Sequence, residues 1–65
     1  MTFPISARTL YRDYLIELQQ SDQGWRVLRV AHCLGGAKSF FPALVYHCDR
    51  VAAEEEGRSL IDARY

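Results

Sequence analysis

Two histidine–cysteine pairs are the residues of this chain best suited to hold a metal. His32 precedes Cys33, and His47 precedes Cys48 fifteen positions later; imidazole and thiolate are ligands that zinc prefers. Neighbouring residues of a strand point to opposite faces, so one pair cannot offer both side chains to one metal. A hairpin between the pairs would also separate them by roughly 20–25 Å, at about 3.3 Å per residue. We therefore predict neither a metal site nor a disulfide, whose Cα atoms lie within about 7 Å.

The same residue types do not assemble a catalytic site. A cysteine nucleophile needs its histidine base within hydrogen-bond reach, and adjacent strand residues face apart. Residues 35–39 contain the glycine, lysine and serine of a phosphate loop. They lack its full spacing, and a strand is predicted to follow where a phosphate loop is followed by a helix. The sequence therefore predicts no catalytic residue, no cofactor and no enzyme.

The elements that carry these residues change in kind near Asp49. Upstream, apolar residues recur at strand-like spacing or in short runs, whereas over residues 49–65 they recur at helical spacing. The pattern predicts one α+β domain over residues 1–65, with a three-stranded antiparallel sheet packed on a C-terminal helix (βββα). A chain of 65 residues is close to the lower limit for independent folding, so we expect a monomer or a homodimer.

The first predicted strand covers residues 9–20. Apolar and polar residues alternate over residues 14–18, which favours a strand. The alternative is a helix with Ser6 as its N-cap and an apolar stripe along one side. Residues 1–8 are expected to be extended.

The second and third predicted strands cover residues 25–33 and 39–48. The second is the clearer, although neither of its faces is purely apolar, and a bulge would shift the inward face. Pro42 cannot donate a ladder hydrogen bond, so the third strand must lie at the sheet edge or bulge there. A meander satisfies this condition with the Trp25 strand in the centre.

The predicted helix begins after Asp49, a favourable N-cap. At 100° per residue one stripe faces the sheet, formed by Ala53, Gly57, Leu60, Ile61 and the stem of Arg64. Gly57 costs about 1 kcal/mol relative to alanine. We expect close approach of helix and sheet in return, with Gly57 facing an aromatic side chain.

Charge and hydropathy limit the classes of partner. The formal net charge is zero, divided into +2 over residues 1–48 and −2 over residues 49–65. Duplex-DNA binders usually carry a clear basic excess, so direct nucleic-acid binding is the less favoured class. Residues 1–8 lack the features of a signal peptide, and no apolar run approaches the roughly 20 residues that span a bilayer. We expect a cytoplasmic protein with no membrane contact.

The helix offers an acidic candidate surface. Glu55 and Asp62 are seven residues apart and so share one face, with Glu54 alongside. The structural interpretation of these acids is that they stabilise the helix. Acidic side chains are favourable near a helix start, and Glu54 can pair with Arg58 four residues later. The functional interpretation is a ridge that meets a basic groove on a protein partner and competes there with nucleic acid.

The sheet offers a basic candidate surface for nucleic acid. Its members are three cations and two aromatic side chains: Arg12, Arg26, Arg29, Tyr11 and Trp25. The pairs Tyr11-Arg12 and Trp25-Arg26, with the βββα order, resemble plant AP2 domains and the arm-binding domains of phage integrases. That resemblance implies a sheet laid in the DNA major groove, although Asp13 stands where AP2 domains have glycine.

A second resemblance is one of type. A neutral, motif-free α+β chain of this size is similar to the small phage and mobile-element proteins that inhibit bacterial defence, including anti-CRISPR proteins. It implies a stoichiometric inhibitor that covers a surface of a CRISPR effector. The preferred prediction is therefore a non-enzymatic protein-binding inhibitor acting through Glu54, Glu55 and Asp62 on a nucleic-acid-handling complex. The alternatives are a nucleic-acid module using Arg12, Arg26 and Arg29, or an oligomerising structural protein that buries its first strand or Trp25.

Overall fold

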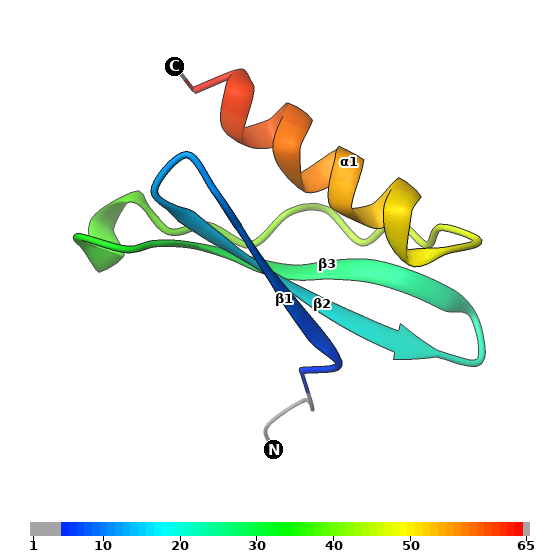
Figure 1. The fold of residues 1–65 in the computed structure, drawn as a ribbon. Helices are drawn as coiled ribbons and strands as arrows, with labels where there is room; N and C mark the ends of the chain where they lie inside the picture. The colour runs from blue at the N-terminus through cyan, green and yellow to red at the C-terminus, as the bar shows by residue number, and fades with distance from the viewer. Residues whose placement is uncertain (1–4, 65) are drawn as a thin grey trace.

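A three-stranded antiparallel meander and one helix laid across it form the fold (Figure 1). The computed structural model describes residues 5–64. Its elements are β1 (Ala7–Tyr11), β2 (Tyr14–Ser21), β3 (Gly24–His32), the short 3₁₀ helix η1 (Gly36–Lys38) and α1 (Arg50–Asp62). The predicted βββα order is confirmed. In the described part of the chain, no helix has the length and apolar character needed to cross a membrane.

The predicted first strand is in fact a hairpin, so the prediction of one strand over residues 9–20 is wrong. Arg12 and Asp13 form its two-residue turn, with φ angles of 48° and 66°. Positive φ at both positions is the geometry of the hairpin turns that match strand twist, and Asp tolerates it. The central strand is therefore β2, between β1 and β3, and not the Trp25 strand. Of the predicted extended segment, residues 1–4 lie outside the described residues.

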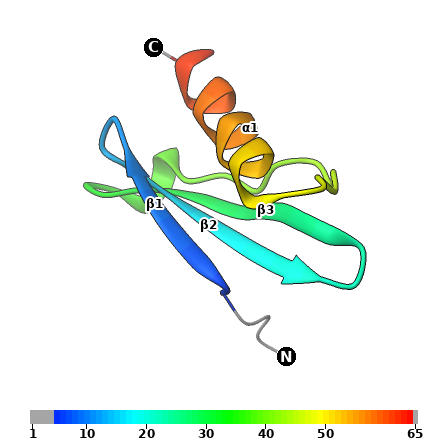
Figure 2. The ribbon, with the colours of Figure 1, turned by 45° about the vertical axis from the view of Figure 1, so that its right-hand side comes forward.

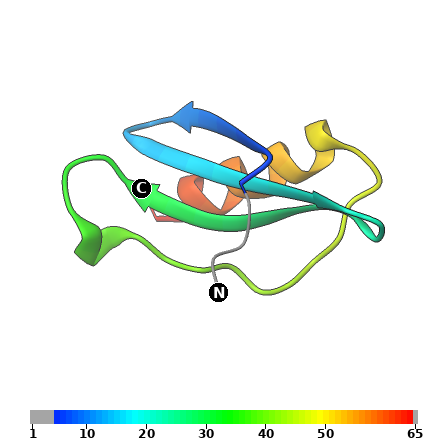
Figure 3. The ribbon, with the colours of Figure 1, turned by 90° about the horizontal axis from the view of Figure 1, so that it is seen from below.

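The predicted third strand, residues 39–48, is an extended segment outside the sheet. We call it the strap. It runs along the β3 edge (Figure 3) and meets β3 only at two isolated antiparallel bridges, Val30 with Phe40 and Trp25 with His47. Six strap residues between the bridges face four residues of β3, so no regular ladder can form. Pro42 lies in this mismatched stretch, as its missing N–H requires.

A bulge in β3 makes one face of the sheet apolar. The register between β2 and β3 shifts between Glu17 and Leu18, so that Glu17 pairs with Arg29 and Leu18 with Val27. Val27 and Val30, three residues apart, are therefore both buried on the face that carries Leu18. The core consists of Tyr14, Ile16, Leu18, Val27, Val30, Ala53 and Ile61.

The helix packs on this apolar face. Asp49 is its N-cap and accepts a hydrogen bond from the Ala52 amide at 2.9 Å. Ala53, Gly57 and Ile61 are buried, as the helical stripe predicts. Gly57 does point inward, but it faces the aliphatic Ile16 and not an aromatic ring.

Candidate functional site

Only one face of the sheet is covered by α1 (Figure 2). The opposite face, which we call the open face, carries the side chains that alternate with the buried ones. No described helix or strand is packed against it. By register its members are Arg8 and Leu10 from β1, Leu15, Glu17 and Gln19 from β2, and Arg26, Arg29 and Ala31 from β3.

Glu17 organises the centre of the open face. In the strand register Glu17 lies opposite Arg8 of β1 and Arg29 of β3, and its side chain is only 6% exposed. The Arg29 Nε and Nη2 donate to its two carboxylate oxygens at 2.9 and 3.0 Å. This hydrogen bonding, and then the charge of Glu17, raises the pKa of Arg29 above its ordinary value. Arg29 is therefore held as a cation in one orientation on the sheet surface.

The rest of the open face mixes cationic and apolar groups. Arg26 donates from Nε to the Gln19 Oε1 at 2.8 Å, while Leu10 is 67% exposed. Three arginines against one glutamate give this face a net charge of +2. Arginine is enriched in protein contact sites, whose centres are more apolar than the remaining surface, and the net charge favours an anionic partner.

The three arginines predicted to form a nucleic-acid surface do not lie together in the structure. Arg26 and Arg29 share the open face, but Arg12 lies in the β1–β2 turn and its Nε is 3.2 Å from the Asp62 carboxylate. Tyr11 and Trp25 belong to the helix-covered side: both pack against the core. The predicted cation-and-aromatic surface is therefore not assembled as one patch.

The acidic set is largely paired within the chain. Glu54 accepts hydrogen bonds from the Arg50 Nε and the Thr9 hydroxyl, each at 2.8 Å. Its predicted partner Arg58 lies 3.8 Å away. The bond from Arg50 lowers the pKa of the Glu54 carboxyl, the Thr9 hydroxyl acts in the same direction, and partial burial opposes them.

The other two acids differ from each other. Asp62 accepts hydrogen bonds from the Tyr11 hydroxyl, at 2.9 Å for the nearer oxygen, and pairs with Arg12. Glu55 is exposed and has no hydrogen bond or ion pair among the described residues. The helix therefore presents one uncompensated acid of the predicted three, because the others fasten α1 to the β1–β2 hairpin.

Replacing Glu54 by glutamine is expected to destabilise the fold in a pH-dependent way. The pKa of the folded carboxyl is depressed, so its contribution is present above the unfolded pKa of about 4.3 and is lost as pH falls through the lower folded pKa. Glu54→Gln should reduce the free energy of unfolding near neutral pH by about 0.5–1.5 kcal/mol. Urea unfolding should show this difference shrinking in acid. Glu55→Gln makes the same change at an unpaired site and should have no effect at either pH.

A contact that sequence reasoning missed joins the strap to the helix. The His47 Nε2 lies 2.6 Å from the Glu56 Oε1, and both side chains are about one-fifth exposed. Their separation of nine residues spans a turn and the start of a helix, so no local periodicity signals the pair. It holds the strap end against α1, and this use of His47 is structural.

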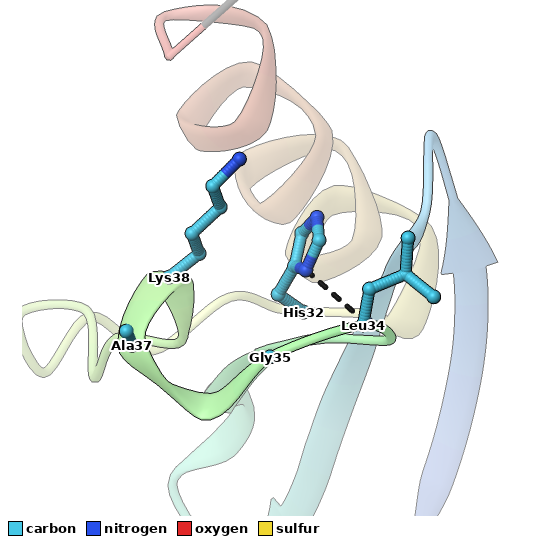
Figure 4. Close-up of a pocket in the computed structure, with 5 residues that line it drawn as sticks. All are labelled: His32, Leu34, Gly35, Ala37 and Lys38. Carbon is cyan, nitrogen blue, oxygen red and sulfur yellow. Dashed lines mark hydrogen bonds between the residues drawn. The ribbon is translucent and has the colours of Figure 1, made fainter.

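The remaining histidine lines a shallow pocket of about 320 Å³ beside η1 (Figure 4). The lining residues are His32, Leu34, Gly35, Ala37 and Lys38. The His32 Nδ1 accepts the Leu34 amide at 3.2 Å, and its ring meets Tyr14 edge-on. One imidazole and one ammonium without a nucleophile do not constitute a catalytic set.

The two histidine–cysteine pairs lie at opposite ends of β3. His47 is bridged to Trp25 near the strand start, whereas Cys33 follows the strand end. Both cysteines are exposed free thiols. Within residues 5–64, no three potential ligands are grouped as a metal site requires. Comparison of the chain with protein-family models, curated proteins and solved structures gave no match.

Proposed function

We propose that this chain is a non-enzymatic protein-binding module that covers an acidic part of a partner's surface with its open face. The observation that carries the proposal is the grouping of Arg8, Arg26 and Arg29 with the exposed Leu10 on a face over which no described element packs. Arginine is enriched in protein interfaces because its planar donor fork recognises carboxylates in two-point geometry.

A protein partner is favoured over nucleic acid by what surrounds these arginines. Arg29 already binds Glu17, and Arg26 binds Gln19, so part of their hydrogen-bonding capacity is used within the sheet. Leu10, Leu15 and Ala31 supply aliphatic surface, whereas the aromatic side chains that stack on bases lie on the other face. Nucleic-acid binding through Arg26 and Arg29 is the second candidate, favoured by their common position on the open face.

The inhibitor function implied by the resemblance to anti-CRISPR proteins is compatible with surface covering. In that form the contact set is Glu54, Glu55 and Asp62, which would meet a basic groove. Glu54 and Asp62 would first have to leave their arginines, at the cost of the contacts that fasten α1. The open face is therefore the better-supported contact surface.

Photo-crosslinking tests the proposal directly. A photoreactive residue is placed at Leu10 on the open face or at Glu55 on the helix, and adducts are identified in a lysate of the source cells. We expect a specific protein adduct from position 10 that is lost in the double variant Arg8→Glu/Arg26→Glu. Arg29 is left unchanged because it donates hydrogen bonds to both oxygens of Glu17, and its loss would leave that buried carboxylate without this partner.

The matched control carries the same total change of charge away from the open face. Lys38→Glu/Arg64→Glu alters η1 and the chain after α1, and should leave the position-10 adduct intact. Adducts from position 55 alone would instead support the acidic helix. Salt-sensitive fluorescence anisotropy with labelled DNA or RNA, lost only in the Arg8→Glu/Arg26→Glu variant, would establish the nucleic-acid alternative. No adduct and no such binding would contradict both candidates.

A further inference from the structure

The shallow pocket beside η1 has a wall with only one kind of charge. His32 and Lys38 are its two polar side chains, and the rest of the wall is Leu34, Gly35 and Ala37 (Figure 4). No Asp or Glu of the described chain lines it. Its volume of about 320 Å³ is at the lower end of the roughly 300–1,000 Å³ typical of small-molecule sites. The pocket therefore has room for a small organic molecule and no carboxylate that would repel an anion.

The connection between β3 and the strap brings the two polar side chains together. An isolated antiparallel bridge joins Val30 to Phe40. Two residues further along β3, the His32 amide donates to the Ser39 hydroxyl at 2.9 Å. Figure 4 shows the His32 ring and the Lys38 side chain extending from the backbone on the same side, toward α1. The imidazole and the ammonium are therefore both available to one ligand.

Both of these polar groups are hydrogen-bond donors. The His32 Nδ1 accepts the Leu34 amide at 3.2 Å, so the proton of the neutral imidazole is on Nε2. Within residues 5–64 this Nε2 makes no hydrogen bond, and it is not buried. The Lys38 ammonium has three donors and no acceptor, and it too has no partner among the described residues. A ligand that accepts hydrogen bonds from both groups is therefore required.

A second cation lies at the same end of the sheet. The Arg64 guanidinium carbon is 3.8 Å from the centre of the Phe40 ring. That ring packs edge-on against Tyr14, with centroids 6.4 Å apart, and the His32 ring meets Tyr14 edge-on as well, at 4.8 Å. Arg64 and the ammonium in the pocket thus give this end of the domain a positive potential, which favours an anionic ligand.

We infer that the pocket binds a small organic anion, with a carboxylate or phosphate group between the His32 Nε2 and the Lys38 ammonium. Such a group accepts hydrogen bonds from both donors and neutralises the ammonium. Leu34, which is 86% exposed, and Ala37 supply apolar surface for the rest of the ligand. Since His32 packs against the core residue Tyr14, the pocket lies on the helix-covered side of the sheet. The site is therefore separate from the open face that the proposed function uses.

Nuclear magnetic resonance of the full chain gives a direct test, because Lys38 is the only lysine of the sequence. Protein labelled with ¹³C-lysine reports the Lys38 side chain alone. Titration with phenyl phosphate or with benzoate should shift the Lys38 and His32 side-chain signals in a saturable way. The His47 ring, 2.6 Å from Glu56, is the internal control and should not shift. The ligand with the lower dissociation constant identifies phosphate or carboxylate as the preferred group.

Matched variants and a neutral ligand establish that charge is recognised. Lys38→Met keeps most of the side-chain stem without its charge, and should raise the dissociation constant of the tighter ligand by about 10-fold. Arg8→Met removes one charge at an exposed position of the open face and should leave that constant unchanged. Benzyl alcohol has a similar apolar body without a charge, and we expect it to bind at least about 10-fold more weakly.

Three outcomes would overturn the assignment of an anion site. The first is that neither phenyl phosphate nor benzoate shifts the Lys38 signals at concentrations up to about 10 mM. The second is that benzyl alcohol binds as tightly as the anions, which would make the pocket merely apolar. The third is that Arg8→Met weakens binding as much as Lys38→Met, which would show a general effect of net charge.

Discussion

Gly57→Val is expected to destabilise the domain by about 1–3 kcal/mol through overpacking. A Cβ at position 57 would lie 2.8 Å from Cγ2 and 2.9 Å from Cδ1 of Ile16. Ile16 has no exposed surface and cannot move into solvent, so α1 must lift from the sheet. In a domain of this size each kcal/mol lowers Tm by about 4–8 °C. Thermal unfolding followed by circular dichroism measures the loss.

Two variants separate the clash from other effects of the substitution at Gly57. Ser59→Val places the same β-branched residue at an exposed position of α1 and should change Tm little. Combining Gly57→Ala with Ile16→Ala removes the atoms that the new Cβ would meet. The double variant should therefore be more stable than the sum of the single effects predicts. A Gly57→Val protein as stable as Ser59→Val would show that the helix does not approach the sheet at this point.

Gly24→Ala is expected to lower the stability of the domain by a similar amount. Gly24 lies beside the bridge between Trp25 and His47, at the C-terminal end of the strap. Gly24 has a φ of 121°, which L side chains rarely adopt, and its Cβ would overlap the His47 carbonyl oxygen. That oxygen accepts the Trp25 amide at 2.8 Å. Backbone strain of this kind costs about 1–3 kcal/mol, and the bridge between β3 and the strap should open as well. Urea unfolding and amide exchange at Trp25 and His47 report the two effects separately.

Gly35→Ala provides the matched control for Gly24→Ala. Gly35 has a φ of −174°, and nothing lies within 4 Å of its added Cβ. The free energy of unfolding should stay constant or rise by up to about 1 kcal/mol, because alanine has fewer unfolded conformations. If Gly24→Ala leaves amide exchange at His47 unaltered, the strap is not anchored by this bridge.

The helix and the class of fold were readable because their signals are local. The 3.6-residue period over Ala53, Gly57 and Ile61 and the N-cap at Asp49 depend on neighbours within a few positions. The bulge in β3 was also signalled, since neither strand face is purely apolar in a regular register. The hairpin at Arg12 and Asp13 was not, because its turn lacks glycine and the tyrosines on both sides are a residue type that is common within strands. The sequence of the strap is typical of a strand. It forms no regular ladder because six of its residues face only four residues of β3 between the two bridges.

By itself the sequence determined the order of elements, the start of α1 and the inward position of Gly57. Tertiary structure alone decided which charged groups are available to a partner. Asp62 meets Tyr11 across 51 positions, and Glu54 meets Thr9 across 45. Packing of α1 on the sheet creates these pairs, so no periodicity within either segment encodes them. The same packing leaves Arg26 and Arg29 on the open face, because a single helix covers only one side of a three-stranded sheet.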